Sequence, residues 1–198
     1  MTRGWVYSVA LTAFIAATAM AVASIWIPHW VTYSVTTPNG DTFEKHIGLH
    51  RSCSTLDDPP CRIFPTNELC QDGERYFCSM WRTIGFMASF AVILCLACLV
   101  SFIVIMGGGK YKQETGWPFV SAMLTLVSVV EFVIISLVAY LFDNDEQFAI
   151  PGWKLDASWF MSTFSATLCL ISAGGIALSA YLLPPDDGYD FLEDPFDA

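Results

Sequence analysis

Long runs of apolar residues alternate with short polar segments along the whole chain. Four windows are nearly free of charged residues: Trp5–Ile27, Thr83–Met106, Trp117–Phe142 and Ala157–Leu183. Each window is longer than the about 20 residues that an α-helix needs to cross the hydrocarbon of a bilayer. Backbone groups inside lipid must find their hydrogen-bond partners within the segment, so we expect four helices. The pattern predicts an all-α membrane domain, residues 1–183, built as a four-helix bundle in the lipid bilayer.

The first window has an alternative interpretation as a cleaved signal peptide. Arg3 precedes the apolar run, and Ala21-Val22-Ala23-Ser24 resembles a cleavage site of the small-x-small type. The run is longer than the usual core of a signal peptide, so we favour a membrane span.

Basic residues and cysteines predict which side each connection faces. Residues 107–116 contain Lys110 and Lys112, whereas Lys154 is the only basic residue in 143–156, and cytoplasmic connections are richer in Lys and Arg. The long connection, residues 28–82, contains an even number of cysteines, which is typical of disulfides in an oxidising space: Cys53, Cys61, Cys70 and Cys78. We therefore expect a multi-pass plasma-membrane protein with outer loops at 28–82 and 143–156 and both termini in the cytoplasm.

The first outer loop contains a pattern typical of a β-hairpin. Val31, Tyr33 and Val35 alternate with polar residues, the turn sequence Pro-Asn-Gly-Asp follows, and a second strand-like run reaches Leu49. Two strands alone are marginally stable, so disulfides would support a small extracellular β-sheet. Four cysteines allow three pairings, and their spacing does not choose among them.

A set of residues in this loop resembles a family signature. Trp30 follows the first span, then come Gly48-Leu49 and the cysteines Cys53 and Cys61, all before the second span. This order, together with the topology, resembles the claudin-like tetraspan superfamily of claudins, peripheral myelin proteins, epithelial membrane proteins and fungal plasma-membrane tetraspans. His50 stands where the signature has a tryptophan.

The resemblance implies specific roles for these residues. It implies that Cys53 pairs with Cys61, which leaves Cys70 and Cys78 to each other. It also implies that Trp30 places the extracellular sheet at the membrane surface and that the two outer loops make the contacts. The alternative is an irregular disulfide-bonded loop without family meaning.

No pattern of chemically active residues points to catalysis. The sequence contains no nucleophile motif, phosphate-binding glycine loop or metal-ligand array, so we expect no enzyme, no cofactor and no nucleic-acid partner. His46 and His50 are four residues apart, and in an extended strand that spacing is ~13 Å, too far for one metal ion. We therefore expect no metal site.

Glu131 is the one ionisable residue within a predicted span. A charged residue there costs a few kcal/mol, and such residues usually face the interior of the bundle. We favour a protonated or hydrogen-bonded glutamate that bridges to a serine or threonine of a neighbouring helix. The alternative is a small ion transporter that uses Glu131.

Small residues in the spans predict where helices approach closely. Ala13, Ala17 and Ala21 recur every four residues in the first span, and Gly175 and Ser179 do so in the fourth. Cysteines within the spans are expected to be packing residues: Cys95, Cys98 and Cys169.

The last 15 residues, 184–198, form an acidic tail with six acidic and no basic residues. We expect it to be disordered and cytoplasmic. Tyr189 to Leu192 resembles a tyrosine-based sorting signal, and Asp194-Pro195-Phe196 resembles a clathrin-adaptor-binding tripeptide. The alternative is a tail that only solubilises the chain end.

These features together favour a non-enzymatic, claudin-like membrane protein that organises plasma-membrane domains or cell contacts through its outer loops. Its expected partners are further copies of itself or another membrane protein, with a cytoplasmic adaptor at the tail. The alternative function is that of an auxiliary subunit that modulates a channel or transporter.

The tail leads to a first testable prediction. Deletion of Gly188–Ala198 should slow internalisation and raise surface abundance without affecting folding, because an adaptor would lose its apolar anchors at Tyr189, Leu192 and Phe196. Surface biotinylation followed over time measures this. Equal uptake of full-length and truncated chains would leave the tail as a solubilising end.

Overall fold

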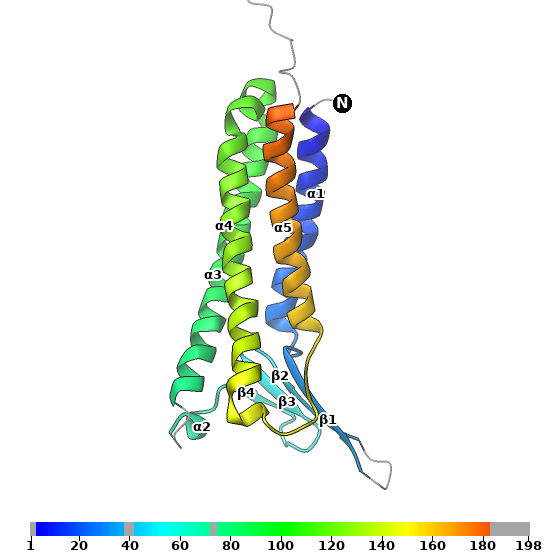
Figure 1. Cartoon of the computed structure of the whole chain (residues 1–198), viewed down its shortest axis with the longest axis vertical. Coiled ribbons are helices and arrows are strands. Elements are labelled where there is room, and N and C mark those ends of the chain that lie inside the picture. Colours follow the sequence, from blue (N-terminus) through cyan, green and yellow to red (C-terminus); the bar gives the residue numbers. More distant parts are fainter. Residues whose placement is uncertain (1–2, 38–41, 72–74, 183–198) are drawn as a thin grey trace, which may run out of the picture.

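Four long helices lie side by side, with a small β-sheet at one end of the bundle (Figure 1). This computed structural model describes residues 3–37, 42–71 and 75–182. We call the end that carries the sheet the sheet end and the other the opposite end. Within the described residues, four helices are long and apolar enough to cross a membrane, as expected of a multi-pass membrane protein: α1 (Arg3–Trp26), α3 (Arg75–Gly107), α4 (Gly109–Asn144) and α5 (Ala157–Leu182).

Two of these helices are longer than their apolar windows. α3 begins at Arg75, before the apolar window that starts at Thr83. α4 begins at Gly109, so the predicted turn over 107–116 is mostly helix. A helix of 33 residues is ~50 Å long, well over the ~30 Å of bilayer hydrocarbon. Hydropathy marks only the lipid-buried part of a helix. α3 continues past it to the level of the sheet (Figure 1), and α4 continues past it at the opposite end.

The sheet contains five antiparallel strands in the order β4-β3-β2-β1-β5. β1 (Val31–Thr36) and β2 (Thr42–Ile47) form the predicted hairpin, with Val31 opposite Ile47; its Asn39-Gly40 turn lies outside the described residues. Three further strands were not predicted: β3 (Arg51–Ser54), β4 (Cys61–Ile63) and β5 (Trp153–Leu155). β5 comes from the loop between α4 and α5 and pairs with β1. The expectation of a sheet confined to the first loop is therefore wrong.

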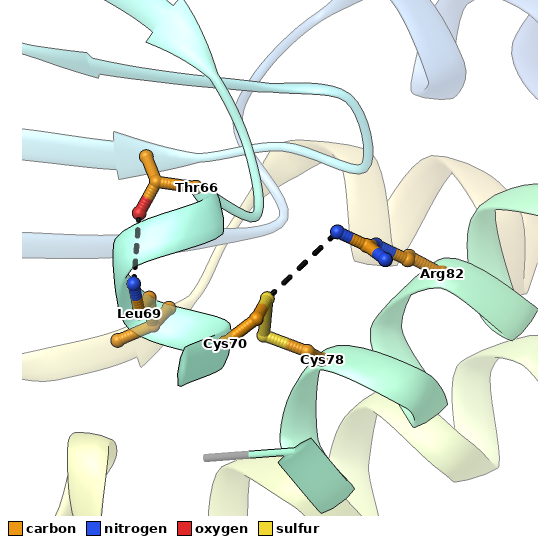
Figure 2. The surroundings of a disulfide bond; sticks show 5 residues. All are labelled: Thr66, Leu69, Cys70, Cys78 and Arg82. Carbon is orange, nitrogen blue, oxygen red and sulfur yellow. Dashed lines mark hydrogen bonds between the residues drawn. A yellow bond between two sulfur atoms is a disulfide. The ribbon is translucent and has the colours of Figure 1, made fainter. Parts of the chain in front are cut away.

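Two disulfides connect the elements of the first loop. Cys53 is bonded to Cys61 across the β3–β4 pair. Cys70, in the short helix α2 (Asn67–Gln71), is bonded to Cys78 in the first turns of α3 (Figure 2). The pairing implied by the family resemblance is thus confirmed. The first disulfide holds an edge strand to the sheet, and the second holds α2 to the membrane helix.

A cluster of aromatic side chains joins the sheet to the bundle. Trp30 and Trp81 are fully buried, and both indole N–H groups are hydrogen-bonded: Trp30 Nε1 donates to Ser24 O at 2.7 Å and Trp81 Nε1 to Gly48 O at 3.2 Å. Leu49 is buried beside them. Buried indoles need such a partner for their polar atom. Trp30, Gly48 and Leu49, the residues of the family signature, therefore all lie at the junction of sheet and membrane helices.

Small and polar residues pack between the membrane helices. Ala17 and Ala21 of α1 are buried, as expected. Gly174 and Gly175 have no atom within 4 Å of the position a Cβ would take, so the close approach predicted for the fourth span does not occur at its glycines. α5 instead turns serines toward the core, and Ser165 donates to Ala17 O at 2.9 Å. The cysteines of the spans are free and buried, as packing residues would be: Cys95, Cys98 and Cys169.

The junction leads to a prediction about Gly48. A Cβ there would lie 2.6 Å from the Cα of Pro28, a backbone atom that cannot move aside easily. Gly48→Ala should therefore lower the free energy of unfolding by about 1–3 kcal/mol, the usual cost of overpacking. Thermal unfolding in detergent measures the change. Gly174→Ala is the matched control, because the space around Gly174 is open, and equal stability of the two variants would contradict the prediction.

Candidate functional site

The two loops meet where β1 lies between β2 and β5. Asp156 N donates to Trp30 O at 3.1 Å, and Ser158 N donates to His29 O at 3.0 Å. Ser158 Oγ donates to Ile27 O at 2.9 Å. These bonds tie the start of α5 to the end of α1. They place His29, which precedes β1, next to Asp156, which follows β5.

Three side chains from different segments form a polar cluster at this point, which we call the His–His–Asp cluster: His29, His46 and Asp156. His29 Nδ1 lies 3.3 Å from Asp156 Oδ2, and the imidazole rings of His29 and His46 stack at 4.2 Å with an angle of 13° between them. Thr32 lies opposite His46 in the β1–β2 register. Its hydroxyl donates to Asp156 Oδ2 at 2.5 Å and lies 2.9 Å from His46 Nδ1.

The environment of Asp156 favours its ionised form. Partial burial raises the pKa of this carboxyl group. Hydrogen bonds from Thr32 and from the backbone N–H of Ala157, together with the nearby His29 and Lys154, outweigh burial and hold the pKa below its usual value. Asp156 Oδ1 accepts from Ala157 N at 2.8 Å, so the same carboxylate also binds the first N–H of α5. The cluster therefore contains a fixed negative charge at neutral pH.

The sequence does not indicate this cluster. His50 is the histidine nearest His46 in the chain, but its ring lies against α3, where a Cβ on Gly85 would be 3.1 Å from His50 Cε1. The partners of His46 are instead Thr32, His29 and Glu44. His29 and Asp156 have no spacing signal because they lie in different loops. The available signal was topological: His29 follows one span and Asp156 precedes another, on the same side of the membrane.

Glu131 lies inside the bundle, at 2% exposure. Ser165 Oγ of α5 lies 3.0 Å from Glu131 Oε1, which is the expected bridge to a serine of a neighbouring helix. Glu131 Oε2 has no hydrogen-bond partner among the described residues. The bridge links α4 to α5, and through the second bond of Ser165 it also reaches α1. The geometry suits a structural role, and the role itself stays a prediction.

The sorting-signal candidates of the acidic tail stay a prediction. Tyr189, Leu192, Asp194, Pro195 and Phe196 all lie outside the described residues.

Replacement of Glu131 tests its structural role. Glu131→Gln should fold and traffic nearly normally, because the amide keeps a hydrogen bond to Ser165. Glu131→Leu should lower the free energy of unfolding by about 1 kcal/mol, the scale of an interhelical hydrogen bond in membranes. Unfolding in detergent measures this, and combining Glu131→Leu with Ser165→Ala should add less than the sum of the two changes. An ion or proton flux that Glu131→Gln abolishes at normal expression would support a transporter instead.

A search against protein-family models finds no match to this chain, and a search of curated proteins finds none either. The resemblance to claudin-like tetraspans therefore depends on the signature residues and the topology alone.

Proposed function

We propose that this protein is a non-enzymatic, claudin-like membrane protein that organises plasma-membrane domains or cell contacts through its two loops. The observation that carries the proposal is the pairing of β1 with both β2 and β5. This pairing joins the two loops in one sheet, so that they offer a single surface to a partner. The buried junction of Trp30 and Trp81 holds that surface on the membrane helices.

The disulfides support an extracellular position for the sheet end. Both bonds lie in the first loop, and such bonds persist in oxidising compartments. α1 begins and α5 ends at the opposite end (Figure 1), which places the start of α1 and the end of α5 on the cytoplasmic side under this proposal.

Exposed apolar side chains at the sheet end support contact with another protein. Leu56, between β3 and β4, is 70% exposed, and Ile150, in the second loop, is 59% exposed. Val35 in β1 is also exposed. Apolar groups from both loops favour burial against a partner. We propose that the partner is a second copy of this chain or another membrane protein.

A different feature favours the second candidate function, that of an auxiliary subunit. A hollow of about 740 Å³ lies between α1 and α5. Its lining is almost wholly apolar and includes Val9, Ala13, Leu168 and Gly175. A transmembrane helix of a channel or transporter could pack there, since small residues let helices approach closely.

Replacement of the exposed apolar side chains tests the first candidate function, contact through the two loops. The double variant Leu56→Asp with Ile150→Asp should lower self-association severalfold, because each aspartate would be buried unpaired at the contact. Stepwise photobleaching of fluorescently tagged copies at the cell surface counts the chains in each assembly. Proximity labelling from the first loop identifies other proteins that the variant no longer contacts.

Ser34→Asp is the matched control. Ser34 is an exposed residue of β1, so this variant adds one of the two negative charges of the double variant without removing an apolar contact. Assemblies of unchanged size and unchanged labelled neighbours in the double variant would contradict a contact role for the sheet end. Stoichiometric co-purification of one large membrane protein with wild type and double variant alike would favour the auxiliary subunit.

A further inference from the structure

We propose that the His–His–Asp cluster is a binding site for one transition-metal ion of the Zn²⁺ class. His29, His46 and Asp156 would be its protein ligands. This site goes beyond the contact function proposed above and does not depend on it.

The separation of the ligand atoms fits one small ion. One ligand atom from each of the three residues can be chosen so that all three lie within 4.8 Å of one another. His29 Nδ1 and Asp156 Oδ2 are 3.3 Å apart. Ligands about 2 Å from a tetrahedral Zn²⁺ are also about 3.3 Å from one another. The Thr32 hydroxyl contacts both Asp156 Oδ2 and His46 Nδ1, so these atoms face the same small volume.

The types of ligand select the class of ion. Two imidazoles with one carboxylate are typical of Zn²⁺ and of neighbouring transition metals. Ca²⁺ and Mg²⁺ prefer sets made of oxygen ligands, so the two histidines disfavour them. Three protein ligands leave the fourth tetrahedral position to water or to a group from a partner.

Two further groups contact the proposed ligands and orient them, as supporting groups do in known metal sites. Glu44 Oε2 lies 3.5 Å from His46 Nε2, the ring nitrogen that would not bind the ion. A carboxylate in this position orients a metal-binding histidine and makes it more basic. Ala157 N fixes Asp156 Oδ1 and so directs Oδ2 toward the histidines. Glu44 and Asp156 together supply two negative charges for a divalent cation.

The stacked rings show what must change on binding. An imidazole binds a metal along a lone pair in the plane of its ring, and two rings only 13° from parallel cannot both point at one ion. One ring must therefore turn about its Cβ–Cγ bond. The His29 side chain is 38% exposed and lies in the link between α1 and β1, so it has room to turn. Its exposure also gives the ion access from the aqueous side.

A bound ion would connect segments that are far apart in the chain. His29 lies between α1 and β1, His46 in β2, and Asp156 between β5 and α5. The ion would therefore bridge both loops beside the adjacent ends of α1 and α5. Because a ligand that binds only the folded state stabilises it, Zn²⁺ should raise the unfolding temperature of the protein.

Zn²⁺ titration of the purified full chain in detergent micelles tests the site. A chromophoric chelator competes for the metal and reports affinity and stoichiometry. We expect one ion per chain, a raised unfolding temperature, and a loss of affinity of at least tenfold in His29→Ala and His46→Asn. Asp156→Asn, which keeps an oxygen to accept from Ala157 N, should show a similar loss. Glu44→Gln should weaken binding about 10- to 100-fold, as loss of such a supporting carboxylate does.

His50→Ala is the matched control, because His50 is an exposed histidine of the same loop outside the cluster. It should bind Zn²⁺ as the wild type does. Co²⁺ in place of Zn²⁺ should give the spectrum of nitrogen and oxygen ligands, without the charge-transfer band of a thiolate. Ca²⁺ should leave the unfolding temperature unchanged.

Four results would overturn the proposal. They are absence of Zn²⁺ binding by the wild type, full affinity in folded His29→Ala, a thiolate band with Co²⁺ that assigns the metal to the cysteines of the spans, and stabilisation by Ca²⁺ equal to that by Zn²⁺.

Discussion

The pairing of β1 with two strands from different loops is the constraint on which the sheet end depends. β1 follows α1 after a short link, and a single residue separates β5 from α5. Antiparallel pairing of the two strands therefore fixes the adjacent ends of both membrane helices. The same pairing brings Asp156 to His29 and His46. Without this pairing, the two loops would not share one sheet and the His–His–Asp cluster would not form.

The second constraint is the burial of Trp30 and Trp81 between sheet and helices. Each indole N–H donates to a backbone carbonyl: that of Trp30 to Ser24 near the end of α1, and that of Trp81 in α3 to Gly48 between β2 and β3. The extension of α3 beyond its apolar window makes this second bond possible, since Trp81 precedes the part predicted to lie in lipid. Gly48 permits the close approach to Pro28. A buried junction of this kind would suit the contact surface that we propose.

Inside the membrane, hydrogen bonds take over the role that hydrophobic burial has in water. Lipid is as apolar as the helix surfaces, so burial alone gives little preference for association. Ser165 of α5 supplies polar contacts that favour association, since its hydroxyl contacts both Glu131 of α4 and the backbone of α1. Ser128 bonds in the same way to the backbone of α5. These bonds hold α1, α4 and α5 together beneath the sheet.

The sequence by itself determined the four spans, the β1–β2 hairpin and, through the family signature, the disulfide of Cys53 with Cys61. These features depend on local periodicity or on residues close together in the chain. Only the tertiary structure decided the length of α3, because hydropathy reports lipid contact and not helix length. It also decided the place of β5 and the meeting of His29 with Asp156. Strand pairing between distant segments is set by folding of the whole chain, and no local pattern encodes it.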